Sequence, residues 1–305
     1  MTIKYFLCLI LICVCANSYG SALHTQLIDD LNHLANNPLM GRKTATEGAA
    51  NTRAYLHSRL SKFNLNVSEQ TFTYKSGIFE HAQGINIIAV PTKSTQRQKI
   101  IITAHYDHLG KRGGKYYFGA NDNATGVAAL LYLASSLQNK EFPYELVFVL
   151  TDAEENGLHG SKHFAQTLNS NNVLMNINLD MLGVKKHKSR LYALTSYSLK
   201  QKLKPVFTAL NNTKITIKPV YSSKQMNRLI KSQNIDWHKA SDHYSFAQNN
   251  IPYVYFGMGH DPHHHTTKDT VQHIDIPKYV STVLAIEGFI KKLAHHHYDD
   301  LNAET

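Results

Sequence analysis

The sequence predicts an α/β fold, a three-layer αβα sandwich around a mixed sheet whose central strands are parallel. Short apolar runs alternate with amphipathic stretches of helical period along the chain. Residues 99–104, 146–150 and 173–179 are apolar enough to be covered on both faces, as central parallel strands are. The links are short and contain no repeat or low-complexity linker, so we expect a single domain over residues 21–305.

Helices are predicted where apolar residues recur every three or four positions. Leu23, Leu27, Leu31 and Leu34 mark the first such stretch. Pro205 lies within the fifth and can kink or shorten it, because proline has no backbone N–H. The predicted helices span residues 21–36, 47–63, 126–137, 161–168, 199–210 and 277–294.

Strands are predicted where apolar residues alternate or form short β-branched runs. Residues 67–74 alternate, whereas residues 85–90 are mostly apolar. The predicted strands span residues 67–74, 85–90, 99–104, 146–150, 173–179, 214–220 and 253–256. Because strands and helices alternate, we expect helices on both faces of the sheet.

Residues 1–20 have the pattern of a secretory signal peptide. Lys4 precedes an apolar run over residues 5–16, and the small residues Ser18 and Gly20 follow it. The run is shorter than the roughly 20 residues that span a bilayer, so we expect cleavage after Gly20 and no stable membrane anchor. The mature chain is therefore expected to be secreted or periplasmic.

The composition limits both the partners and the metals of the mature chain. The net charge is +10, but the basic residues are dispersed, as in residues 185–188. The chain has no basic block with interleaved aromatic residues, so we expect no nucleic-acid binding. All three cysteines, Cys8, Cys13 and Cys15, lie in the predicted leader. Any metal must then be held by His, Asp and Glu, a ligand set that suits zinc, with manganese or cobalt as substitutes. We expect a monomer.

Five stretches place His or acidic residues where a strand end or a loop is predicted. They are His105-Tyr-Asp107, Gly119-Ala-Asn-Asp122-Asn123, Glu154-Glu155, Asn178-Leu-Asp180 and His265-Thr-Thr-Lys-Asp269. A single His after a strand is more often structural, and an Asp before a helix is more often an N-cap. Functional groups gather at the carboxyl edge of an open α/β sheet, however, and several strand ends that deliver ligands to one edge favour a single metal site.

The residue types within these stretches indicate hydrolytic chemistry. Asp107 can accept the second ring N–H of His105, which would fix its tautomer. Asp122 lies in a loop of small residues just before a predicted helix and could bridge two metals. The adjacent acids Glu154 and Glu155 repel one another unless a cation is near, which suggests one metal ligand and one general base.

Charge balance favours two ions over one. Asp122, Asp180 and Glu155 carry three negative charges, and two Zn²⁺ with a bridging hydroxide bring the sum to zero. The run His263-His264-His265 offers three candidate imidazoles, and a His run alone is weak evidence for metal binding.

As a set, these motifs resemble the secreted co-catalytic zinc exopeptidases of the bacterial leucyl aminopeptidase and aminopeptidase Y type. The resemblance covers nearly all of the mature chain and also includes Leu39-Met-Gly-Arg42, Asn86-Ile-Ile-Ala89, Ala104-His-Tyr-Asp-His108, Glu154-Glu-Asn-Gly-Leu-His-Gly-Ser161 and Ser241-Asp-His243. It implies two Zn²⁺ per chain bridged by Asp122. His105 and Asp180 would complete one site, and Glu155 and His265 the other.

The resemblance also implies the remaining roles. Glu154 would be the general base, Asp107 and Asp269 would support the ligands, and Asp242 with His243 would shape the substrate pocket. Some relatives have a Tyr four residues before the Asp of Ser-Asp-His, where it stabilises the tetrahedral intermediate. Here that position holds His238, so the group with this role is left unassigned.

The expected function is a metallo-aminopeptidase that hydrolyses N-terminal residues from peptides with a free N-terminus. A carboxypeptidase or a single-zinc glutaminyl cyclase of the same fold is the nearest alternative, and His105 with its neighbour Asp107 argues against the cyclase. A non-catalytic peptidase-like binding module is the third alternative, and the complete ligand set argues against it.

Overall fold

The computed structural model describes residues 22–93, 98–183, 190–210, 214–232 and 235–294. The predicted leader over residues 1–20 and the lysines at 185–188 lie outside these ranges. In the described part of the chain, no helix is long and apolar enough to cross a membrane.

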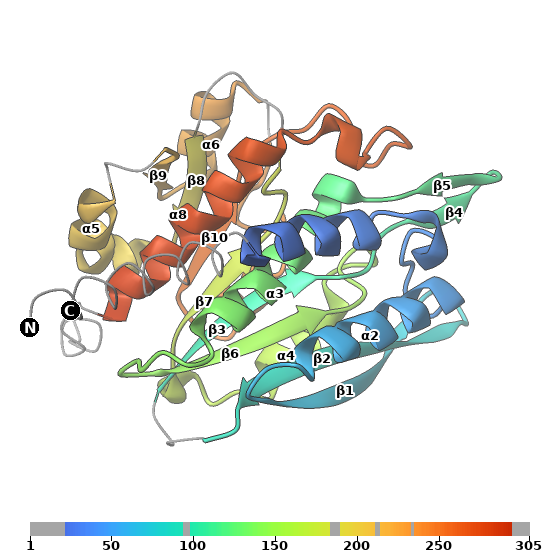
Figure 1. The fold of residues 1–305 in the computed structure, drawn as a ribbon, viewed down its shortest axis with the longest axis horizontal. Helices are drawn as coiled ribbons and strands as arrows, with labels where there is room; N and C mark the ends of the chain where they lie inside the picture. Colours follow the sequence, from blue (N-terminus) through green and yellow to red (C-terminus); the bar gives the residue numbers. More distant parts are fainter. Residues whose placement is uncertain (1–21, 94–97, 184–189, 211–213, 233–234, 295–305) are drawn as a thin grey trace, which may run out of the picture.

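An eight-stranded mixed sheet forms the middle layer (Figure 1). Its order is β1-β2-β6-β3-β7-β10-β8-β9. Strands β6, β3, β7 and β10 are parallel neighbours in the centre, whereas β1, β2 and β8 each have an antiparallel neighbour. The strands are β1 (Leu65–Lys75), β2 (His81–Pro91), β3 (Lys99–His105), β6 (Glu145–Thr151), β7 (Val173–Leu179), β8 (Arg190–Thr195), β9 (Thr216–Val220) and β10 (Tyr253–Gly257). The predicted mixed sheet with a parallel centre is confirmed.

Helices cover both faces of the sheet, which confirms the three-layer sandwich. The main hydrophobic core joins one face to the helix over residues 22–34 and to α2 (Glu47–Leu60), α3 (Thr125–Leu137), α5 (Lys200–Ala209) and α8 (Ile276–Ala294). Smaller clusters join the other face to α4 (His159–Gln166), α6 (Ser223–Ile230) and α7 (His243–Gln248). Side chains alternate between the two faces along each strand. Ile100 and Ile102 of β3 pack in the main core, whereas Ile101 packs in a smaller cluster on the other face.

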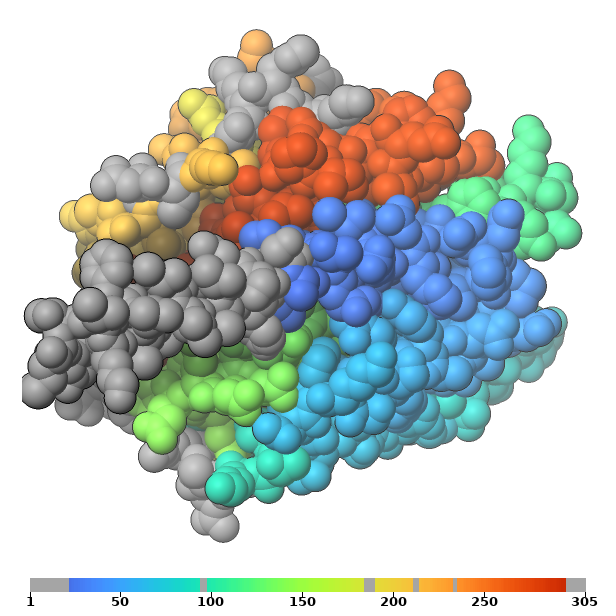
Figure 2. All heavy atoms as spheres, in the orientation of Figure 1, coloured from blue at the N-terminus to red at the C-terminus, as the bar shows by residue number. Residues whose placement is uncertain are grey.

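The N-terminal helix is part of the core rather than an appendage. Leu27, Leu31 and Leu34 are at most 1% exposed, as their spacing predicts. Figure 2 shows this segment in blue between α8 in red and α2 in light blue. Arg59 of α2 donates to both carboxylate oxygens of Asp30, at 2.6 and 2.9 Å, and so ties the two helices together.

Some elements differ from the sequence-based expectation. Strand β8, helices α6 and α7, and the hairpin of β4 (Gly110–Arg112) and β5 (Lys115–Tyr117) were not predicted. They are three to eight residues long, too short to establish a period. Helix α5 continues through Pro205 instead of ending there.

Candidate metal centre

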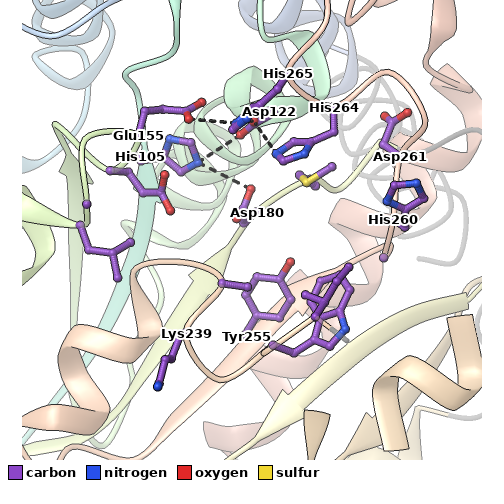
Figure 3. A pocket seen from close by; sticks show the side chains of 18 residues that line it. His105, Asp122, Glu155, Asp180, Lys239, Tyr255, His260, Asp261, His264 and His265 are labelled. Atoms are coloured by element: carbon purple, nitrogen blue, oxygen red, sulfur yellow. Dashed lines mark ion pairs between the residues drawn. The ribbon is translucent and has the colours of Figure 1, made fainter. Parts of the chain in front are cut away.

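Three central strands end at one edge of the sheet and deliver three of the predicted ligand stretches to it. His105 is the last residue of β3, and the parallel register places it beside Thr151, the last residue of β6 and three residues before Glu154. Asp180 directly follows β7. The loop after β10 and the short turn Ala120–Ala124 before α3 contribute the remaining ligand candidates. The structure therefore brings all five predicted stretches together (Figure 3).

His105, Asp122 and Asp180 form a compact group of potential metal ligands. Nε2 of His105 lies 3.4 Å from Oδ1 of Asp122 and 3.6 Å from Oδ1 of Asp180. Zinc bonds of about 2.0–2.1 Å in a tetrahedron place neighbouring ligand atoms about 3.3 Å apart, so these separations fit a shared zinc ion. Among the described residues, Nε2 of His105 and Oδ1 of Asp180 are buried and have no hydrogen-bond partner. Such atoms are what a bound cation would satisfy.

His265 joins Asp122 to Glu155 on the other side of the centre. Its Nε2 lies 3.2 Å from Oδ2 of Asp122 and 2.9 Å from Oε2 of Glu155. Asp122 belongs to all three compact groups of potential ligands in the described part of the chain, and its two oxygens face different partners. This is the arrangement that a bridging carboxylate requires.

Two histidines of the centre were not singled out from the sequence. His108 is buried, and its Nδ1 lies 2.7 Å from Oε1 of Glu155 in a hydrogen bond. His264 lies with Nε2 3.2 Å from Oδ2 of Asp122. His108 stood inside a quoted motif and His264 inside the His run, but neither signal distinguishes a side chain that faces the centre from one that turns away.

Asp107 supports the two adjacent acids in a way that differs from the prediction. Its carboxylate accepts the backbone N–H groups of Glu154 and Glu155 at 3.1 and 3.2 Å. Nδ1 of His105 lies 3.2 Å from the backbone carbonyl of Asp107, nearer than the 3.7 Å to its carboxylate. The carbonyl is therefore the acceptor that orients the ring, and the carboxylate holds the Glu154–Glu155 loop instead.

Further buried groups fix the loops on either side. Asp269 accepts the backbone N–H groups of Asn121 and Asp122 at 2.8 and 3.0 Å. Asp152 accepts from the hydroxyls of Thr44 and Tyr106 and from two backbone N–H groups. These carboxylates have complete sets of donors and act on the ligands through the backbone.

Electrostatics at the centre reflect many acids in a small volume. Burial raises the pKa of Glu154 well above its ordinary value, opposed by His105 and reinforced by neighbouring carboxylates. Burial alone would raise the pKa of Asp122, but His105, His264 and His265 hold it well below the usual range. Contacts with Asp122 and Glu155 raise the pKa of His265 to about 10. A dication would relieve the mutual repulsion of these carboxylates.

A pocket of about 380 Å³ opens beside the candidate ligands. Glu154, Leu158, Trp237 and Tyr255 line it, and Figure 3 shows the Tyr255 hydroxyl directed toward Asp180. His238 is not among the lining residues of the described chain, because its Nδ1 lies 2.6 Å from the hydroxyl of Tyr253. The ring of His238 therefore contacts Tyr253 and does not form part of the described pocket wall.

Asp242 and His243 do not line the pocket within the described residues. Both are fully buried. Asp242 accepts the hydroxyl of Thr151 at 2.6 Å, and the ring of His243 contacts the carbonyl of Trp237 at 2.9 Å. These contacts connect the pair to the end of β6 and to the backbone of Trp237, which lines the pocket.

Comparisons with known proteins identify the family to which this fold belongs. Residues 86–288 match the family described as Peptidase family M28. Aminopeptidase YwaD of Bacillus subtilis is 33% identical over 131 residues, which are 42% of this chain and 28% of that protein. A glutaminyl-peptide cyclotransferase of Dictyostelium discoideum is 27% identical over 203 residues, 57% of this chain and 54% of that protein. The chain thus matches about half or less of the length of these two relatives.

Solved structures share the fold. BSAP, a zinc aminopeptidase from Bacillus subtilis, aligns with a TM-score of 0.73 at 15% identity and covers 88% of this chain and 95% of its own. The family match covers two thirds of the chain and confirms the resemblance drawn from the motifs. The chain therefore belongs to peptidase family M28.

Proposed function

We propose that the chain is a zinc-dependent aminopeptidase that binds two Zn²⁺ and hydrolyses the N-terminal peptide bond of peptides. The observation that carries the proposal is the set of compact ligand groups that share Asp122 at one wall of a pocket. Membership of a peptidase family and the likeness to aminopeptidase YwaD support it. His105, Asp122 and Asp180 would hold one ion, and Asp122, Glu155 and His265 the other.

Glu154 is proposed as the general base. It lines the pocket, yet it belongs to none of the compact ligand groups in the described part of the chain, so its carboxylate is free to take a proton. Bound zinc would act as a Lewis acid and lower the pKa of a water. Asp107 holds the backbone of Glu154, and general-base catalysis of this kind contributes about 10²–10⁴ in rate.

The charge of the pocket favours a substrate with a free amine over one with a free carboxylate. A carboxypeptidase needs a cation that faces the substrate C-terminus. Lys239 is the single Lys or Arg among the described residues that line the pocket. Its amine points away from the candidate ligands in Figure 3 and lies 3.6 Å from Asp236. The described lining thus offers no other lysine or arginine to a substrate C-terminus, whereas an uncharged terminal amine can bind a zinc ion held by these acids, and the hydroxyl of Tyr255 is available to the scissile carbonyl.

Glutaminyl cyclisation is the second candidate function, because a relative of that name matches over half of this chain. The complete group of His105, Asp122 and Asp180 argues for a second metal, which a single-zinc cyclase does not need. Metal stoichiometry therefore separates the two.

The proposal is tested with a panel of substrates and a metal count on the purified protein. Aminoacyl chromogenic substrates should be hydrolysed, N-blocked peptides should not, and two zinc ions per chain should be recovered. Glu154→Gln should keep both ions and lose at least about 10²-fold in kcat. Cyclisation of N-terminal Gln peptides with one zinc per chain, or cleavage of N-blocked peptides, would refute the proposal.

A further inference from the structure

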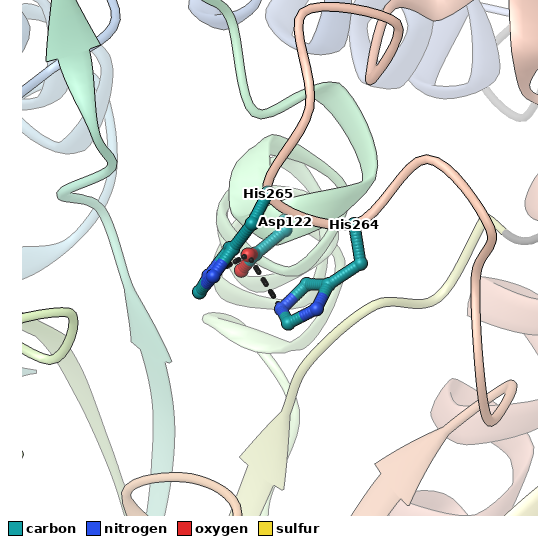
Figure 4. Close-up of side chains that lie close together, drawn as sticks. All are labelled: Asp122, His264 and His265. Atoms are coloured by element: carbon teal, nitrogen blue, oxygen red, sulfur yellow. Dashed lines mark ion pairs between the residues drawn. The ribbon is translucent and has the colours of Figure 1, made fainter. Parts of the chain in front are cut away.

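Two consecutive histidines point to the same carboxylate oxygen. Nε2 of His264 and Nε2 of His265 each lie 3.2 Å from Oδ2 of Asp122. Their rings are stacked, with centroids 3.8 Å apart (Figure 4). The three residues form one of the compact groups of potential ligands.

The local backbone explains how neighbours in sequence reach one target. Adjacent side chains of an extended segment point in opposite directions. His265 instead has a φ of 56°, in the left-handed region that is costly for a residue with a Cβ. The N–H of His264 donates to the carbonyl of Asp261 at 3.2 Å, which closes a turn just before it. A conformation of this cost at a histidine is typical of a functional constraint.

Hydrogen bonding does not account for this convergence. The distances would allow both imidazoles to donate to Asp122, but Oδ2 of Asp122 is buried without a hydrogen-bond partner among the described residues. His108, by contrast, does make a hydrogen bond of good geometry, to Glu155. Each Nε2 therefore lies close to Oδ2 without a well-directed hydrogen bond to it, and both rings face the space beside that oxygen. Their separations from Oδ2 match the spacing of about 3.3 Å expected between ligands of one zinc ion.

We infer that His264 is a metal ligand alongside His265, so that Asp122, Glu155, His264 and His265 together hold the second ion. This inference rests on the proposed zinc-dependent function. The two sites would then differ in their number of protein ligands, with four at the second site and three at the site of His105. Closed four-ligand sites hold zinc firmly, whereas a catalytic site keeps an open position. The second site should therefore hold its zinc more firmly than the first.

Zinc affinity tests this inference without relying on catalysis. We would titrate zinc into metal-stripped wild-type protein, His264→Ala and His263→Ala, in competition with a chromophoric chelator. His263 is the matched control, because it belongs to the same run but its ring packs on His273 with centroids 4.2 Å apart. His264→Ala should bind the zinc ion of the second site at least about 100-fold more weakly, since the loss of even an outer-sphere partner lowers metal affinity by about 10–100-fold. His263→Ala should match wild type.

Cobalt substitution gives a second readout. His264→Ala should change the visible absorption of one bound Co²⁺ and leave the other unchanged. His264→Gln, which keeps a similar size, repeats both measurements should the alanine variant lose its circular dichroism signal. Wild-type zinc affinity and an unchanged cobalt spectrum in either folded variant would overturn the inference. Wild-type protein that takes up no zinc would instead refute the proposed function.

Discussion

Replacing Arg42 with methionine should remove about 3 kcal/mol or more from the free energy of unfolding. The guanidinium is fully buried and donates to four backbone carbonyls, those of Leu34, Tyr106, Phe118 and Gly119, at 2.6 to 2.8 Å. Methionine fills a similar volume but donates no hydrogen bond. Each buried carbonyl left without a donor costs about 1–3 kcal/mol, so the three buried ones, those of Leu34, Tyr106 and Gly119, cost at least about 3 kcal/mol.

The same bonds connect the fold to the candidate metal centre. Tyr106 lies between His105 and Asp107, and Gly119 directly precedes the turn that carries Asp122. The loss of Arg42 therefore frees both ligand segments at once, and zinc affinity should fall together with stability. Burial lowers the pKa of Arg42 to about 10, opposed by Asp269 and Asp122, so the side chain stays charged at neutral pH.

Urea unfolding in zinc-free buffer measures this effect separately from metal loss. Lys43→Met is the matched control, because Lys43 is the exposed neighbour in sequence. The control should stay within about 0.5 kcal/mol of the parent. Arg42→Lys should fall between the two, because an ammonium group reaches fewer carbonyls than a guanidinium. A loss below about 1 kcal/mol for Arg42→Met would refute the reasoning, since the carbonyls would then have found other donors.

Three further predictions concern the site and its support. Asp122→Ala should release both zinc ions, measured by metal analysis after gel filtration, and a variant that keeps two would contradict the bridge. Tyr255→Phe should lower kcat about 10²-fold with unchanged zinc content, if its hydroxyl stabilises the developing oxyanion; an unchanged kcat would exclude that role. Burial lowers the pKa of His243 to about 3, whereas the unfolded value is about 6.5. Unfolded His243 thus binds a proton first as pH falls, so stability should drop by about 2 kcal/mol between pH 7.5 and 5. His243→Gln should remove that part of the pH dependence in urea unfolding, and the exposed-site control His81→Asn should not.

The parts of the fold that could be predicted are those with a sustained apolar pattern. The strand predicted at residues 173–179 coincides with β7, and the one at residues 99–104 differs from β3 by a single residue. Strand β8 was missed although its interior is buried. It has six residues, and its place beside β10 depends on a long-range antiparallel pairing that no local pattern reveals.

The site was predictable in its residue types but not in its detailed contacts. His105 and Asp180 lie at the ends of neighbouring parallel strands, so they reach the same edge of the sheet independently of the loop conformations. The positions of His108 and His264 depend on loop conformation, and for His264 on the left-handed backbone of His265. The role of Arg42 was not predictable either, because its partners are backbone carbonyls that lie up to 77 residues away in the sequence.

Hydrogen-bond satisfaction sorts the carboxylates of the centre into two kinds. Asp107, Asp152 and Asp269 each accept at least two donors, and they hold loops in place. Oδ2 of Asp122 and Oδ1 of Asp180 are buried and accept none among the described residues. Leaving a buried carboxylate oxygen without a donor is costly unless a cation faces it. The first kind therefore belongs to the scaffold, and the second kind marks where ions are expected.

Asp242 tests this criterion, because its Oδ1 is also buried without a hydrogen-bond partner in the described part of the chain, yet it belongs to none of the compact ligand groups. Burial raises the pKa of Asp242, and nearby Asp107 adds to the effect. A proton on Asp242 would then satisfy its environment where a metal ion satisfies that of Asp122. A buried carboxylate oxygen without a hydrogen-bond partner therefore indicates a metal ligand only where imidazoles or other carboxylates face the same point, as they do at Asp122 and Asp180.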